Sequence, residues 1–230
     1  MKTEIRWHSE MSATRTIMTI LGILVGTSGA IHGFFEVLQG YRSTDGFFIF
    51  AIGKGNSWTM WTQGSEGAFT LVQNFLVTGI LAIIVGGVLA AWSVFYIKTK
   101  RGSLIFLLIG ICLFLVGGGV AQVPFIVLTA AVITRIDKPL NWWRNNLPKN
   151  LRFTLAKLPF WLFAGFLVLF SIAFEVSIFG FFPQITEPSA LLTISWSTLG
   201  FATVLLLASI VGAFARDIEH NETALLGQKN

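Results

Sequence analysis

Residues 103–134, SLIFLLIGICLFLVGGGVAQVPFIVLTAAVIT, decide how many times this chain crosses a membrane. The segment has 32 residues and no charged side chain. As one straight helix it would reach about 48 Å, whereas the hydrocarbon core of a bilayer is about 30 Å thick. Its centre contains Gly117, Gly118 and Gly119. Glycine and the nearby Pro124 both destabilise a helix interior. We therefore predict two short helices joined by a glycine turn at these residues.

The two short helices would cover 103–117 and 120–135. A single long, kinked helix is the alternative. A further alternative is a re-entrant hairpin, in which both helices enter the membrane and return to the same side without crossing it. The distribution of positive charge helps to choose among these alternatives.

Four other apolar segments have the length of about 20 residues that a membrane span needs. They cover residues 16–39, 70–97, 158–182 and 190–215. The composition agrees, since 54% of the residues are hydrophobic and only 12% are charged, against roughly 25% charged in soluble domains. This excludes a soluble globule, a disordered chain and a coiled coil. The predicted fold is an all-α integral membrane protein, a single polytopic bundle of six transmembrane helices formed by residues 1–230.

Lysine and arginine residues indicate the orientation of this bundle. With six crossings, fourteen of the sixteen Lys and Arg residues fall on one side, and Arg42 and Lys54 fall on the other. With one long helix at 103–134 the best split is ten to six. Because positive residues prefer the cytoplasmic side, we predict six crossings, both termini in the cytoplasm and a location in the plasma membrane. Four spans plus a re-entrant hairpin would give the same distribution of charge.

The two longest loops suggest different roles. The outer loop 41–67 contains an apolar stretch at 47–52, a glycine-rich stretch at 53–56 and a second apolar stretch at 57–62. This pattern predicts a small β-hairpin that caps the outer mouth of the bundle. The alternative is a loop without strands that places Trp58 and Trp61 at the membrane interface.

The inner segment 136–157, together with Arg135 before it, combines six cations with Trp142 and Trp143. Tryptophan favours the headgroup depth of a bilayer, and cations favour anionic lipid. We therefore predict that 135–157 lies on the anionic inner leaflet. A nucleic-acid partner is not expected, because the basic residues lie beside apolar segments.

The first span carries a stripe of small residues. On a helix, its four glycines fall within a narrow sector, which indicates a surface for close helix packing. These glycines are Gly22, Gly26, Gly29 and Gly33.

Uncommon polar residues gather at one depth of the predicted bundle. Charged residues inside spans are costly and indicate function by default, and the spans contain two, Glu36 and Glu175. In the predicted topology these residues and several polar ones lie in the outer part of their helices. The set is His32, Glu36, Gln39, Asn74, Gln122 and Glu175. We therefore predict a polar binding pocket that faces outward.

Two classes of function fit such a pocket. The first is a transporter-like or ligand- or ion-binding protein, coupled to protons or cations through His32 and Glu36, which are spaced to meet on one helical face. The second is an accessory or scaffold subunit in which these residues only fix helix packing, with other membrane subunits or a second copy as partners. No zinc, nucleotide or HExxH motif is present, so no cofactor or metal is expected and an enzyme is not favoured.

Overall fold

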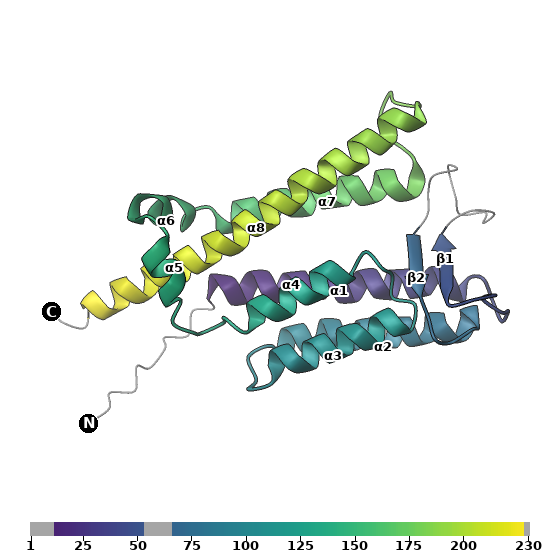
Figure 1. The fold of residues 1–230 in the computed structure, drawn as a ribbon, viewed down its shortest axis with the longest axis horizontal. Coiled ribbons are helices and arrows are strands. Elements are labelled where there is room, and N and C mark those ends of the chain that lie inside the picture. Colours follow the sequence, from purple (N-terminus) through teal and green to yellow (C-terminus); the bar gives the residue numbers. More distant parts are fainter. Residues whose placement is uncertain (1–11, 53–65, 228–230) are drawn as a thin grey trace.

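The computed structural model describes residues 12–52 and 66–227, and the described chain is mostly helical. Within these described residues, four helices are long and apolar enough to span a membrane. They are α1 (Ala13–Val37), α2 (Phe75–Phe95), α7 (Pro159–Phe179) and α8 (Pro188–Gly227). Helix α2 packs along α1, and α7 pairs with α8 (Figure 1). These helices overlap the four long apolar segments of the sequence, and they confirm the predicted helical class.

Helices α3 (Gly102–Leu115) and α4 (Val123–Ile133) replace the single long helix considered for this region. They have 14 and 11 residues, about 21 Å and 16 Å at 1.5 Å per residue, so each is shorter than the hydrocarbon core of about 30 Å. The chain between them contains Gly117 and Gly119, both with positive φ. The described chain thus contains four long helices together with the two short helices and the glycine turn that the sequence predicts. The number of crossings, six or four with a re-entrant hairpin, stays a prediction.

A two-stranded sheet lies beside this hairpin. Strand β1 (Phe48–Ile52) pairs antiparallel with β2 (Glu66–Phe69). The predicted first strand is present. The predicted turn at 53–56 and the second strand at 57–62 lie outside the described residues, and the observed partner strand begins later in the sequence. A small two-stranded sheet in the outer loop is therefore confirmed, and the strand at 57–62 stays a prediction.

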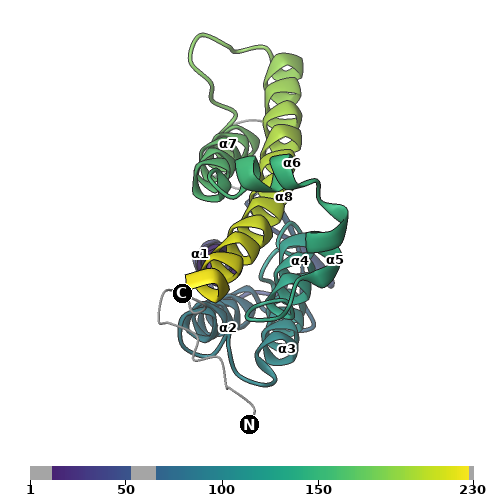
Figure 2. The ribbon, with the colours of Figure 1, turned by 90° about the vertical axis from the view of Figure 1, so that its left-hand side faces the viewer.

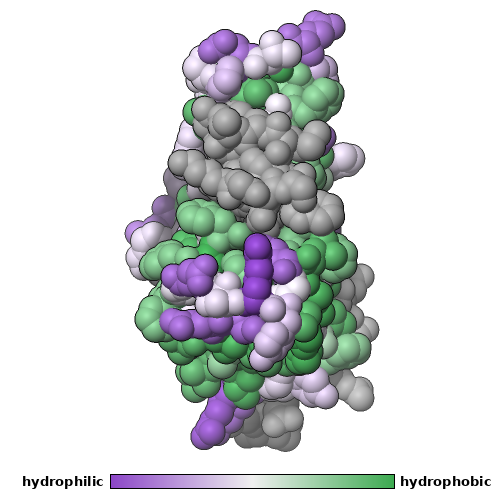
Figure 3. Space-filling view, turned by 90° about the vertical axis from the view of Figure 1, so that its right-hand side faces the viewer, coloured by the Kyte–Doolittle hydropathy of each residue, from purple (hydrophilic) through white to green (hydrophobic). Residues whose placement is uncertain are grey.

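Strand β2 also holds the turn between α3 and α4. The N–H of Gly117 donates to the carbonyl of Phe69 (3.1 Å), and the N–H of Val120 donates to the carbonyl of Gly67 (3.0 Å). We call this end of the bundle, with the sheet, the outer end, and the opposite end, with α5 and α6, the inner end. Viewed from the outer end, hydrophilic side chains form patches with hydrophobic ones around them (Figure 3).

Glycines allow α1 and α2 to approach closely. A Cβ atom on Gly26 would lie 2.5 Å from the carbonyl oxygen of Gly86, and one on Gly33 would lie 2.6 Å from that of Gly79. Gly22 faces Ser93 of α2 in the same way, and Gly29 faces Leu113 of α3. The glycine stripe of α1 is thus in contact with the two helices that follow it.

Two short helices, α5 (Asn141–Asn146) and α6 (Lys149–Leu155), lie at the inner end against α8 (Figure 2). Helix α8 has 40 residues, about 60 Å, so it continues beyond the length of a span. Its Asp217 accepts hydrogen bonds from the backbone N–H groups of Ala13 (2.7 Å) and Thr14 (3.2 Å). This carboxylate therefore caps the start of α1, where N–H groups lack partners within the helix.

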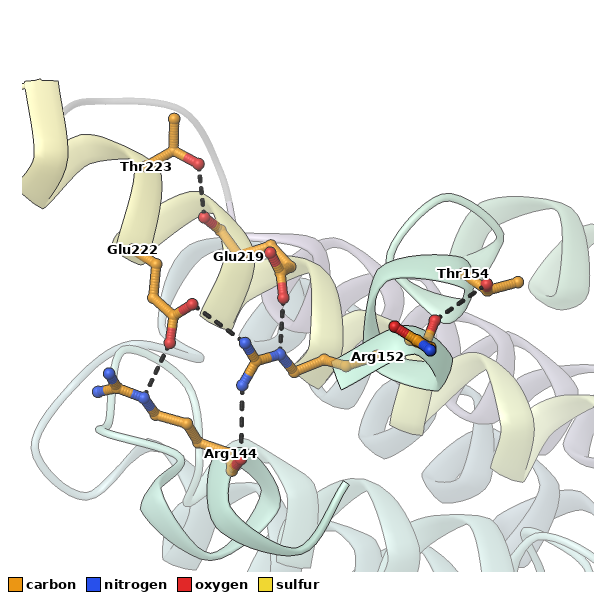
Figure 4. A network of polar contacts seen from close by, with 7 residues as sticks. Arg144, Arg152, Thr154, Glu219, Glu222 and Thr223 are labelled. Carbon is orange, nitrogen blue, oxygen red and sulfur yellow. Dashed lines mark hydrogen bonds and ion pairs between the residues drawn. The ribbon is translucent and has the colours of Figure 1, made fainter. Parts of the chain in front are cut away.

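An arginine joins α6 to the extension of α8 (Figure 4). The almost fully buried Arg152 donates from Nε to Glu219 (2.6 Å) and from Nη2 to Glu222 (3.0 Å). Arg144 of α5 pairs with the same Glu222 (2.8 Å). Two arginines and two glutamates thus form one neutral network at the inner end.

Candidate functional site

A cavity of about 290 Å³ lies between α1, α4, α7 and α8. Apolar side chains form most of its wall, and four of them are aromatic, namely Phe125, Phe170, Phe174 and Trp196. Trp196 is 70% exposed, so the cavity opens beside it. The cavity has apolar walls because all four helices are apolar where they surround it.

The cavity exists because the α7–α8 pair joins the rest of the bundle mainly through its inner half. Phe166 of α7 and Leu206 of α8 belong to the main hydrophobic core that also contains residues of α1 to α4. Nearer the outer end, Ala173 and Leu191 are buried but lie outside that core. The outer halves of α7 and α8 are instead linked to each other by Ser177 and Ser195, whose hydroxyl oxygens are 2.5 Å apart.

Three polar side chains interrupt the apolar wall. The buried Gln122 donates from Nε2 to the hydroxyl of Ser28 (2.9 Å), and both residues line the cavity with Ser177. Gln122 lies directly before α4, so the glycine turn brings it against α1. Hydroxyl and amide groups at this wall can bind one polar group of a ligand, whereas the aromatic rings can bind only its apolar part.

His32 and Glu36 form a pair beside this cavity but do not line it. Both are fully buried, and Nδ1 of His32 lies 3.1 Å from Oε1 of Glu36. Ser28, His32 and Glu36 are spaced four residues apart, so they form one row on the face of α1. A Cβ atom on Gly117 would lie 2.5 Å from Oε1 of Glu36. The pair is therefore enclosed between α1 and the turn that joins α3 to α4.

Gly117→Ala should destabilise the protein by more than the backbone strain that a positive φ causes in an alanine residue. The positive φ of +92° costs an L-residue about 1–2 kcal/mol, and the methyl group would also meet the buried carboxylate of Glu36. Gly40→Ala is the matched control, because Gly40 has φ +76° and open space around it. We expect the apparent Tm in detergent to fall clearly further for Gly117→Ala. Equal falls would show that the contact with Glu36 contributes nothing.

The other predicted site residues lie elsewhere. Glu175 is exposed, in the last turn of α7, and does not line the cavity. Gln39 donates to the carbonyl of Phe50 (3.2 Å). Asn74 accepts a hydrogen bond from the N–H of Val77 (3.2 Å) and caps α2. Among the six predicted residues, Gln122 alone lines the cavity.

The cavity wall includes residues that the sequence did not single out. Ser28 precedes His32 by one helical turn, so its place on the polar face could have been inferred. Phe174 and Trp196 gave no such signal, because aromatic residues are equally common on faces that contact lipid. In the described part of the chain, no group of three or more His, Cys, Asp or Glu residues could hold a metal ion.

Comparisons of the chain with protein-family models, curated proteins and solved structures find no match.

Proposed function

We propose that this protein binds a small lipid-soluble molecule in the cavity between α1, α4, α7 and α8. The observation that supports this proposal is the combination of an apolar wall that contains four aromatic rings with three polar side chains, Ser28, Gln122 and Ser177. Such a site suits a ligand with an apolar body and one group that accepts or donates hydrogen bonds. Of the two classes of function that the sequence favours, this proposal belongs to the first, the transporter-like or ligand-binding proteins.

The size and position of the cavity support a ligand that arrives through the bilayer. Its volume of about 290 Å³ is just below the roughly 300–1,000 Å³ typical of ligand pockets, which suits a small ligand. The exposed Trp196 at its opening lies on a helix that is apolar enough to span the membrane. A lipid-soluble molecule could therefore enter sideways, between α7–α8 and the other helices.

The proposal includes a topology in the plasma membrane. The start of α1 and the end of α8 lie at the same end of the bundle (Figure 1), together with the basic segment 135–157. We assign this end to the cytoplasm by the positive-inside tendency. The α3–α4 hairpin would then enter from the inner end, and the cavity would lie in the outer leaflet.

His32 and Glu36 receive no coupling role in this proposal. Both side chains are fully buried, and neither lines the cavity. A proton- or cation-coupling site needs access to water, whereas a pair that fixes helix packing does not. We assign the pair to the packing of α1 against the α3–α4 turn.

A photoreactive long-chain alcohol with a diazirine on its chain tests the binding site. This probe has an apolar body and a single hydroxyl group. After irradiation of the purified protein, peptide mass spectrometry should locate the label on α7 and α8 residues of the cavity, such as Phe174 and Trp196. Excess unlabelled alcohol should compete with it.

Leu199→Trp, which fills the cavity, should lower this labelling at least tenfold, because Leu199 lines the wall. Phe201→Trp is the matched control, two residues along α8, exposed and outside the cavity. Labelling of the control should remain at the wild-type level. Uniform labelling of exposed residues such as Phe201, with no effect of Leu199→Trp, would contradict the proposal and favour an accessory subunit.

A further inference from the structure

Two cations lie on exposed aromatic rings where α6 meets α7. Nζ of Lys157 is 4.1 Å from the ring centroid of Phe153, and Cζ of Arg216, on α8, is 5.3 Å from that of Phe160. Both rings are exposed. Lys157 comes two residues before α7 begins, and Phe160, which Arg216 contacts, lies in the first turn of α7. We call these two cations, which come from segments distant in the sequence, the basic cluster at the start of α7.

The described carboxylates of this region are engaged elsewhere. Glu219 and Glu222 pair with Arg152 and Arg144, and Asp217 caps the start of α1. Among the side chains that the structure describes, those of residues 12–50 and 67–223, no carboxylate forms an ion pair with Lys157 or Arg216. The cluster therefore has a net positive charge that an external anion can neutralise.

An apolar surface continues from this cluster toward the outer end. Trp161 and Val168 of α7 are 77% and 59% exposed, and their spacing of seven residues places them on one face of the helix. A tryptophan at the end of an apolar helix favours headgroup depth. The surface therefore offers a positive site for a headgroup and, next to it, an apolar track for a hydrocarbon chain.

We propose that Lys157 and Arg216 form a binding site for an anionic phospholipid of the inner leaflet. The lipid phosphate lies between the two cations, the glycerol region lies beside Trp161, and an acyl chain follows α7 past Val168. The apolar track distinguishes this ligand from a free phosphate, which would gain only the charge interaction. The site is separate from the cavity, so it does not depend on the proposed function.

Phosphatidylglycerol, added to the detergent-purified protein, tests the proposal. Bound lipid is counted by native mass spectrometry, and the apparent Kd is taken from the titration. Phosphatidylglycerol should bind more tightly than phosphatidylcholine, which has no net charge. The double variant Lys157→Gln/Arg216→Gln should bind phosphatidylglycerol about 25-fold more weakly, roughly fivefold for each cation.

The double variant Lys100→Gln/Lys138→Gln is the control. It removes the same charge from two exposed lysines of the inner end, and its affinity should stay within twofold of the wild type. Lys157→Arg/Arg216→Lys, which keeps both charges, should retain most of the binding. If Lys157→Gln/Arg216→Gln fails to fold, the charge-keeping variant Lys157→Arg/Arg216→Lys is measured in its place. A large loss of affinity in this charge-keeping variant would contradict the proposal.

Three results would overturn the site. The first is equal affinity for the two lipids in the wild type. The second is an equal loss in both glutamine double variants, which would show a diffuse effect of net charge. The third is displacement of the bound lipid by millimolar glycerol phosphate, which would show that the site recognises a free phosphate rather than a membrane lipid.

Discussion

Gly86→Leu should almost abolish the yield of folded protein. A Cβ atom at Gly86 would overlap the carbonyl oxygen of Gly26 and lie 2.9 Å from the backbone nitrogen of Ala30. Both contacts are with the backbone of α1, which cannot rotate away as a side chain can. Extra atoms in a packed interface cost about 1–3 kcal/mol, and more where the backbone must move. In this interface the two helices would have to separate.

The measurement is the amount of monodisperse protein after detergent extraction, with the apparent Tm from tryptophan fluorescence. We expect at least a tenfold lower yield for Gly86→Leu. Gly87→Leu is the matched control, because Gly87 is the next residue of α2 and has open space around it. Its yield and Tm should equal those of the wild type. Similar behaviour of the two variants would show that α1 and α2 do not pack as described.

The sequence predicted this interface from spacing alone, since four glycines in one narrow sector of α1 indicate close approach of a neighbour. It did not predict the neighbour. Gly79 and Gly86 of α2, which receive the approach of Gly33 and Gly26, are seven residues apart and share a helical face. A comparison of glycine spacing between the two segments could have identified the pair.

Helix ends and breaks were predicted better than the directions in which side chains point. The length of the segment 103–134 and its glycines predicted two helices with a turn, and the structure contains both. The predicted pocket was inferred from depth, and depth does not define which face of a helix a residue occupies. Glu175 is an example, because it lies at the predicted depth but is exposed and does not line the cavity. Helix α7 is apolar on all sides, so its sequence does not distinguish the buried face from the exposed one.

The inner end was the least predictable part. The abundance of cations between 135 and 157 indicated a membrane surface, yet Arg152 points inward to two glutamates of α8. Those glutamates are about 70 residues further along the chain, and no local pattern relates them to α6. Hydrophobic periodicity shows which residues avoid water, whereas ion pairs between distant segments depend on the packing itself.

Arg152→Met should release α5 and α6 from α8. Removal of one partner from a buried ion pair costs about 3–5 kcal/mol, because the opposite charge loses its compensation. Glu219 and Glu222 keep 26% and 28% of their side-chain exposure, so water can compensate part of the loss, and we expect about 2 kcal/mol. Amide hydrogens in 141–155 and 216–223 should then exchange roughly 30-fold faster.

Arg144→Met separates this effect from a general loss of charge. The Arg144 side chain is 55% exposed, whereas that of Arg152 is 7% exposed, and both contact Glu222. An exposed ion pair contributes about 0–1 kcal/mol, so exchange in the same segments should rise less than about fivefold. Methionine keeps most of the apolar volume of arginine in both variants. Equal exchange rates in the two variants would show that the buried Arg152 does not attach α6 to α8. The expected difference would show that this one side chain attaches α5 and α6 to α8.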